Sequence, residues 1–267
     1  MENSVNGLDK NREMIDFENN LSKQYYGQEN ETVFVVWDAI LENQTRKITI
    51  PQDTQRIIGL DTWCERTKID FKGTVEDWCR IVIDNHDNYD RKRKTYYKHP
   101  HQTSHGRRFV QLLGGIAKIF CRSLGYQLYI NEKRVKNLII PDTMSQISDN
   151  AFSSCISLKK VVLPDSIITI GKGAFNECHY LNSVSLGKNV STIEERAFTD
   201  CYSLKYLSIP MSVNHIAKDA LEGCVNLTKI CYEGTVEEWL KLYQSPYDWC
   251  KFTVACSDGK ISYKMKG

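Results

Sequence analysis

Residues 158–181 read LKKVVLPDSIITIGKGAFNECHYL, and residues 181–204 repeat the pattern as LNSVSLGKNVSTIEERAFTDCYSL. Four successive copies of the pattern follow one another at intervals of 23 residues. The same position in each copy holds Pro141, Pro164, Gly187 or Pro210. Seven apolar positions recur at fixed distances from this position. One copy cannot bury its apolar side chains alone, because so short a segment is too small for a core of its own. The pattern therefore predicts a solenoid, in which stacked coils bury a continuous core between them.

The apolar spacing within one copy predicts two short strands and a turn. The LxxVxLP stretch at 158–164 alternates inward and outward side chains, and its proline ends the strand because it cannot donate to a sheet ladder. A second short strand is expected at 168–170, and Ala174–Cys178 fits a single helical or 3₁₀ turn. We expect neighbouring strands to lie about 4.8 Å apart, with the phenylalanines and cysteines in columns inside the stack.

Four of the ten cysteines recur with the period of the repeat. They are Cys155, Cys178, Cys201 and Cys224. Disulfides between neighbours would suit an oxidising compartment. A zinc site would need closely spaced pairs of ligands, and no CxxC occurs in the chain. Because a free thiol behaves as a small apolar side chain, we interpret the four cysteines as equivalent buried positions, and we expect neither a metal nor a cofactor.

The unit LxxVxLPxxIxxIGxxAFxxCxxL resembles the 23-residue leucine-rich repeats of the BspA-like family, also called the Treponema pallidum type. The resemblance covers residues 138–232 in about four copies, with Gly187 in place of one proline and Ala220-Leu221 in place of one Ala-Phe pair. It implies a leucine-rich-repeat solenoid. BspA-like proteins are typically surface proteins of bacteria or protozoa linked to adhesion and host-matrix binding. The resemblance therefore implies a protein-binding role at the cell surface or in the secreted state.

Two similar segments bracket the array. Residues 69–78 read IDFKGTVEDW and residues 230–239 read ICYEGTVEEW. In both, a threonine is followed three residues later by an acidic residue, which predicts a helix that begins with a capping box and buries its tryptophan. Residues 48–57 read as a degenerate repeat, and in the family a GTxEEW segment is followed by a short strand near a CxDG motif, which residues 256–261 fit. We interpret both segments as caps that cover the ends of coils.

Residues 91–108 read RKRKTYYKHPHQTSHGRR and contain no acidic residue. The basic residues of this candidate patch are Arg91, Lys92, Arg93, Lys94, Lys98, Arg107 and Arg108. Such a run contacts nucleic acid or an anionic membrane in some proteins and is a solvated loop in others. Its three histidines have no cysteine or acidic partner in the loop, which disfavours a metal site. Residues 109–120 have the apolar spacing of an amphipathic helix that packs on the solenoid or attaches to lipid.

The composition narrows the class of protein. The 267 residues are 41% hydrophobic and 25% charged, which excludes wholesale disorder, and the net charge of +2 argues against a dedicated nucleic-acid binder. No apolar stretch is long enough to span a membrane, and the opening residues lack the pattern of a secretory signal, so a cytoplasmic location is the default expectation. We divide the chain into a polar N-terminal segment (1–30), a degenerate repeat with a cap-like segment (31–83), a basic insertion with an amphipathic helix (84–125), the repeats (126–232) and a C-terminal cap (233–267).

The sequence contains no GxSxG, P-loop, HExxH or GxGxxG motif. A solenoid offers a long surface rather than one deep cleft, so we predict a non-catalytic protein that binds a protein ligand. The strand residues that alternate outward form the candidate partner-binding face: Lys160, Val162, Ser183, Ser185, Tyr206, Ser208, Lys229 and Cys231. The alternative function is binding of nucleic acid or an anionic membrane through residues 91–122, and such binding would weaken steeply with salt.

Overall fold

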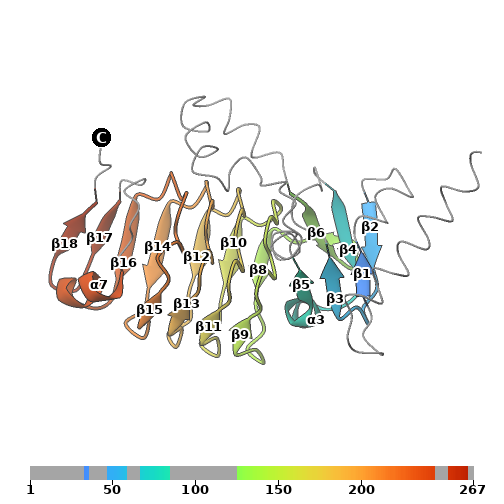
Figure 1. The fold of residues 1–267 in the computed structure, drawn as a ribbon, viewed down its shortest axis with the longest axis horizontal. Coiled ribbons are helices and arrows are strands. Elements are labelled where there is room, and N and C mark those ends of the chain that lie inside the picture. The colour runs from blue at the N-terminus through green and yellow to red at the C-terminus, as the bar shows by residue number, and fades with distance from the viewer. Residues whose placement is uncertain (1–32, 36–46, 59–66, 85–124, 244–251, 264–267) are drawn as a thin grey trace, which may run out of the picture. The chain divides into compact units, whose positions relative to one another are not determined.

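The computed structural model describes residues 33–35, 47–58, 67–84, 125–243 and 252–263. In these residues, short parallel strands stack coil upon coil along one axis (Figure 1). The predicted polar segment at 1–30 lies outside the described residues, and so does the basic insertion apart from residues 84 and 125.

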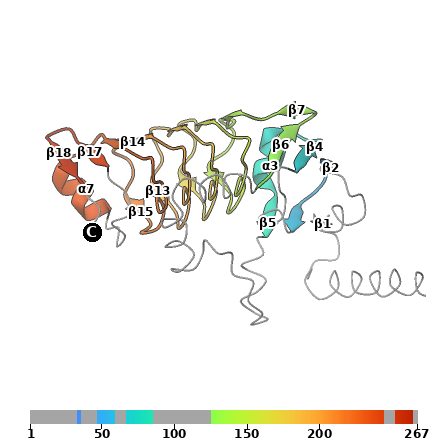
Figure 2. The same ribbon diagram turned by 90° about the horizontal axis from the view of Figure 1, so that it is seen from above.

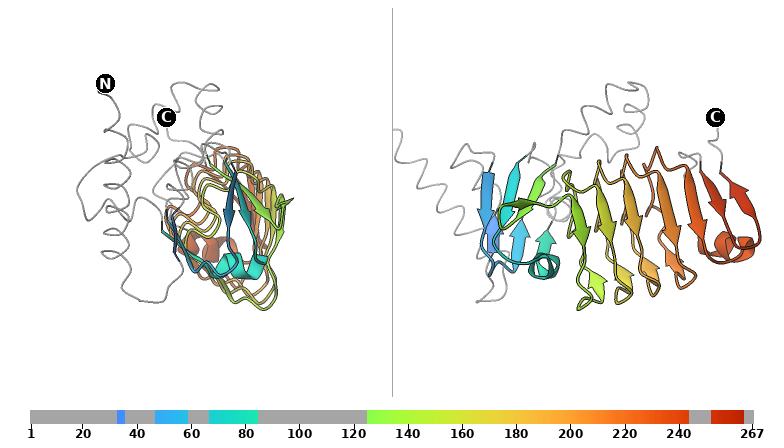
Figure 3. Two further views of the ribbon diagram at one scale, coloured as in Figure 1. Left: turned by 90° about the vertical axis from the view of Figure 1, so that its right-hand side faces the viewer. Right: turned by 180° about the vertical axis from the view of Figure 1, so that it is seen from behind.

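Residues 137–232, here called the main array, form two columns of parallel strands. The first column contains β8 (Asn137–Ile139), β10 (Lys160–Val162), β12 (Ser183–Ser185), β14 (Tyr206–Ile209) and β16 (Lys229–Tyr232), and continues into β17 (Thr253–Ala255) and the antiparallel β18 (Lys260–Ser262). The second contains β9 (Gln146–Ile147), β11 (Thr169–Ile170), β13 (Thr192–Ile193) and β15 (His215–Ile216). Within the main array the ladders pair residues one period apart, such as Lys160 with Ser183 and Thr169 with Thr192. The predicted solenoid is thereby confirmed, and its coils overlie one another when viewed along the stack (Figure 3).

Identical side chains form columns inside the main array because the register is one period. The rings of Phe152, Phe175 and Phe198 are fully buried, and successive rings stack with centroids 5.5 and 5.4 Å apart and nearly parallel planes. The repeated cysteines are buried free thiols, as predicted. Their hydrogen bonds tie each coil to the preceding one: the thiol of Cys178 donates to the carbonyl of Phe152 at 3.1 Å, and the same bond recurs one coil later at 3.2 Å from Cys201.

The Ala-Phe side of the coil carries a further set of bonds between coils. The N–H of Phe152 donates to the carbonyl of Ala174, and the N–H of Phe175 donates to the carbonyl of Ala197, both at 2.8 Å. In this column the N–H groups point toward the following coil and the accepting carbonyls toward the preceding one. The hydrogen bonds of this column therefore all point the same way along the main array.

The predicted turn is present as separate hydrogen-bonded turns rather than as a continuous helix. The N–H of Cys155 donates to the carbonyl of Phe152, three residues earlier. Non-glycine residues with positive φ interrupt the segment, such as Asn150 at 56°, Ser154 at 60° and Glu177 at 57°. This left-handed conformation is uncommon for such residues, and here it lets alternate N–H groups face the next coil.

A shorter stack, here called the N-terminal block, precedes the main array. One sheet contains β2 (Lys47–Ile50), β4 (Lys68–Phe71), β6 (Gln127–Ile130) and the antiparallel β7 (Lys133–Arg134). The other contains β1 (Val33–Val35), β3 (Arg56–Ile58) and β5 (Val82–Asp84). Strands β4 and β6 pair directly, although β5 and residues 85–124 separate them in the sequence.

The two GTVE segments form the same module. Helices α3 (Val75–Arg80) and α7 (Val236–Leu242) both begin with a capping box, and Trp78 and Trp239 are fully buried, as predicted. After each helix the chain returns to a strand that pairs in parallel with the strand before the helix, and an antiparallel strand follows. These strands are β6, which is reached after β5, and β7 in one case, and β17 and β18 in the other. Figure 2 shows α7 beside β17 and β18 at the end of the stack.

The inner copy of this module is bonded to the first coil of the main array. The indole N–H of Trp78 donates to the carbonyl of Ala151 at 2.8 Å. In later coils the equivalent carbonyl, such as that of Ala174, accepts the N–H of a phenylalanine from the preceding coil. Trp78 therefore supplies the hydrogen bond that a missing preceding coil would have supplied. The indole of Trp239 donates instead to the hydroxyl of Tyr263 at 3.0 Å.

We expect Phe175→Ala to lower the free energy of unfolding by about 3–5 kcal/mol, because it leaves a cavity in the core and breaks the stacking on both sides. Urea unfolding followed by circular dichroism measures the change. The matched control is Tyr180→Ala, since this ring is partly exposed and its loss should cost about 1 kcal/mol or less. Equal losses in the two variants would contradict the column.

We expect Trp78→Phe to destabilise the chain more than Trp239→Phe, by about 1–3 kcal/mol. Both changes remove the same volume, but only the first leaves the buried carbonyl of Ala151 without a partner, whereas the partly buried hydroxyl of Tyr263 can bond to water. Urea unfolding of both variants measures the difference. Equal destabilisation would show that the indole bond to Ala151 contributes nothing of its own.

Candidate interaction surface

The eight residues predicted to face outward from the strands lie in two rows along the main array. The ladders join Lys160, Ser183, Tyr206 and Lys229 in one row and Val162, Ser185, Ser208 and Cys231 in the other. None of the eight is buried, while the residues between them, such as Val161 and Leu207, belong to the core. The structure therefore brings these side chains together on one face, here called the strand face.

Tyr206 is the largest side chain of the strand face and is 44% exposed. Its neighbours in the row are Ser183 on one side and Lys229 on the other. A hydrogen bond to the Cys231 side chain, followed by partial burial, raises the pKa of Tyr206. The neutral phenol presents an apolar ring with a polar tip, which suits a binding contact.

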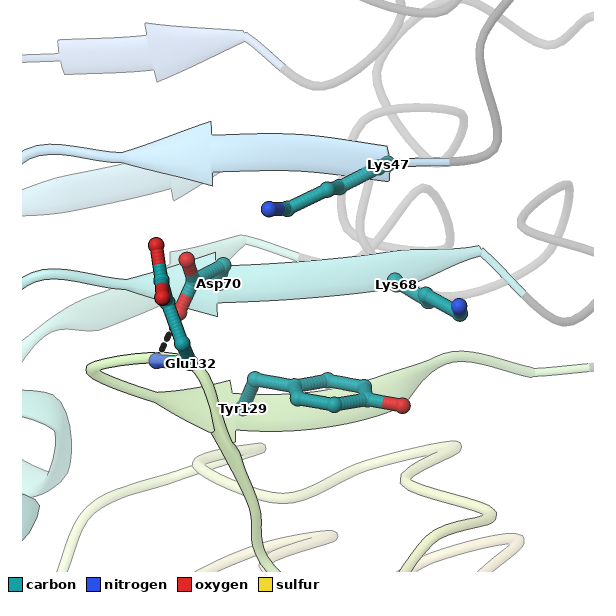
Figure 4. Close-up of a pocket in the computed structure, with 5 residues that line it drawn as sticks. All are labelled: Lys47, Lys68, Asp70, Tyr129 and Glu132. Carbon is teal, nitrogen blue, oxygen red and sulfur yellow. Dashed lines mark hydrogen bonds between the residues drawn. The ribbon is translucent and has the colours of Figure 1, made fainter.

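A pocket that sequence reasoning missed lies on the outward side of the N-terminal block. Its volume is about 200 Å³, and it is lined by Lys47, Lys68, Asp70, Tyr129 and Glu132 (Figure 4). Lys47 lies opposite Lys68, and Asp70 lies opposite Tyr129, so β2, β4 and β6 supply four of the five residues. The signal that could have found it is the shared pattern of KITI at 47–50, KIDF at 68–71 and QLYI at 127–130.

Asp70 is a buried charge in this pocket, with its side chain only 1% exposed. One carboxylate oxygen accepts from Nζ of Lys72 at 2.7 Å, and the other accepts the backbone N–H of Glu132 at 2.8 Å. Burial raises the pKa of Asp70, but these hydrogen bonds and the positive charges of Lys72 and Lys47 outweigh it, so the pKa of Asp70 is lowered overall. The ionised carboxylate ties the β6–β7 turn to β4.

The remaining predicted sites fall elsewhere. The candidate basic patch at 91–108, its histidines and the helix at 109–120 lie outside the described residues, and binding of nucleic acid or a membrane through 91–122 stays a prediction. In the part of the chain that the structure describes, no three His, Cys, Asp or Glu side chains gather as they would around a metal ion. The helices of that part are all too short or too polar to cross a membrane.

Comparison with known proteins also indicates leucine-rich repeats. Residues 122–251 match the family described as BspA type leucine rich repeat region, in six copies. No curated protein matches the chain.

Solved structures of leucine-rich-repeat proteins are also similar. One from Bacteroides capillosus is 30% identical, with a TM-score of 0.34, over 37% of this chain and 77% of that one. One from Bacteroides ovatus is 22% identical, with a TM-score of 0.42, over 78% of this chain and 42% of that one. The protein from T. pallidum is 23% identical, with a TM-score of 0.29, over 35% of this chain and 56% of that one. The chain thus spans less than two thirds of the last two proteins.

We expect Asp70→Asn to lower the free energy of unfolding at pH 7 by about 1–3 kcal/mol, because it weakens a buried charged hydrogen bond. The lowered pKa of Asp70 fixes the pH dependence. The ionised carboxylate stabilises the fold fully above its unfolded pKa of about 3.9, and this contribution is lost as the pH falls through the lower folded pKa.

Urea unfolding between about pH 7 and pH 2.5 should therefore show the difference between the native chain and Asp70→Asn shrinking below about pH 4. Asp142→Asn is the control, because Asp142 is exposed and its change should stay within about 0.5 kcal/mol. A difference for Asp70→Asn that persists undiminished at the lowest pH would contradict a stabilising charge.

Proposed function

The chain belongs to the BspA-type leucine-rich-repeat family, and we propose that it binds a protein ligand through the strand face without catalysing a reaction. Proteins of this family are generally interaction scaffolds. The observation that carries the proposal is Tyr206, an exposed ring held in a row of small and charged side chains. Tyrosine dominates the energetics of many interfaces, because a large rigid ring buries area at little entropic cost.

The backbone beneath the strand face supports this role. Each inner strand of the main array is paired on both edges, so its N–H and carbonyl groups are already satisfied and recognition falls to the side chains. Ser183, Ser185 and Ser208 are small, which lets a partner approach the sheet closely around Tyr206. Lys160 and Lys229, at the two ends of one row, offer charge on either side of this contact.

The family resemblance extends the proposal to adhesion, in which the protein ligand belongs to a host matrix. The support for it is the repeat sequence itself. In that case the purified chain would bind a matrix-coated surface, and the strand-face variant described next would bind it less.

Selection of peptides from a displayed random library tests the proposal without a known partner. We expect selected peptides to bind the double variant Tyr206→Ala/Lys229→Ala at least about tenfold more weakly, as for a pair that includes an interface hot spot. The matched control Tyr180→Ala/Lys218→Ala removes the same residue types from exposed positions off the strand face. Peptides that bind both variants as well as the native chain would refute the strand face as the binding surface.

A further inference from the structure

The strand ladder is interrupted where the N-terminal block meets the main array. Strand β7 ends one sheet and β8 ends the next, and the two strands are not paired with each other. The connection is made instead by bonds such as those of Tyr126, whose N–H donates to the carbonyl of Ser154 and whose carbonyl accepts the N–H of Ile156. One edge of β8 therefore has no strand partner among the described residues.

Exposed cations gather around this interruption. They are Lys133, Arg134, Lys136, Lys159 and Lys160. Arg134 lies opposite Tyr129 of the pocket, and the carbonyl of Lys136 accepts the backbone N–H groups of Lys159 and Lys160, so the group is continuous with the pocket and with the strand face. Within the described ranges none of these five side chains forms an ion pair. Other exposed cations do, such as Lys172 with Glu195 at 2.9 Å.

An exposed apolar side chain lies among these cations. Ile139 of β8 is 68% exposed, more than any other large apolar residue in the described part of the chain. Its register partner Val162 is only partly buried. Large apolar side chains this exposed, bordered by polar groups, are typical of contact sites.

We propose that the junction surface, formed by Arg134, Lys136, Ile139, Lys160 and Val162, binds an extended acidic segment of a polypeptide. Carboxylates of the segment pair with the free cations, an apolar side chain covers Ile139 and Val162, and the open edge of β8 faces the segment's backbone. The inference rests on the proposed protein-binding function and specifies the chemistry of the ligand. A sulfated polysaccharide satisfies the cations equally well, but it has no apolar group to cover Ile139, so the polypeptide is favoured.

The test uses a labelled synthetic peptide in which Glu and Ser surround a central Leu, with the full chain and fluorescence anisotropy as the readout. We expect the double variant Lys136→Glu/Lys160→Glu to weaken binding at least about tenfold, since two attractions become repulsions. Ile139→Ser should weaken binding about threefold to tenfold by removing apolar contact. The matched controls Lys188→Glu/Lys218→Glu and Ile168→Ser change exposed residues off the strand face and should bind as the native chain does.

Three comparison ligands decide the class of partner. A peptide with Lys in place of Glu should not bind, and one with Ser in place of Leu should bind the native chain and Ile139→Ser equally. The proposal would be overturned in favour of a polysaccharide site if heparin bound more tightly than the Glu–Leu peptide and bound the native chain and Ile139→Ser equally well. Failure of the junction variants to weaken the peptide would also overturn it.

The test of the junction surface and the test of the strand face can fail independently of each other. If the acidic peptide ignores the junction variants while selected peptides still depend on Tyr206 and Lys229, only the junction surface is refuted. If selected peptides ignore Tyr206 and Lys229 while the acidic peptide depends on Lys136 and Lys160, the strand face around Tyr206 is refuted instead.

Discussion

The backbone register between coils is the constraint on which the structure depends. Because the strand residues of successive coils in the main array pair 23 positions apart, side chains that recur with this period lie beside their own copies. The phenylalanine stack and the chain of thiol hydrogen bonds are consequences of that register. A shift of one residue would turn every inward side chain to the outside, so the core and the outer surface are fixed by the same bonds.

The sequence alone was sufficient to predict the structural features that recur with the repeat. The columns of Phe175 and Cys178, the two strands per coil and the outward position of Tyr206 follow from period and alternation, and the capped helices follow from the paired GTVE segments. The pocket around Asp70 was missed because β4 and β6 pair directly although many residues separate them in the sequence, so no local pattern brings them together. The bond from Trp78 to Ala151 was missed because no local pattern reports which distant carbonyl lacks a donor.

The interior of the main array stabilises the fold, whereas its outer surface is available for binding. Inside the main array, the polar backbone groups bond to neighbouring coils and the side chains are nearly all apolar. On the strand face, Lys160, Ser183 and Tyr206 contribute little to packing, so these positions are free to vary with a partner. The exposed cations near β7 and β8 are unconstrained in the same way. They lie where the strand ladder is interrupted between the two stacks, so strand pairing does not restrict which side chains can occupy these positions.

The module that contains Trp78 joins the N-terminal block to the main array, and the similar module that contains Trp239 packs on the last coil of the main array. In both copies the indole N–H donates a hydrogen bond. Its acceptor is the carbonyl of Ala151 in the following stack in one case and the hydroxyl of Tyr263 within the same cap in the other. The same helix and buried indole are therefore compatible with a further stack, where the indole meets a backbone carbonyl, and with a cap, where it meets a side-chain hydroxyl. Evolution can thus lengthen such a molecule by joining finished pieces end to end, without remaking either one.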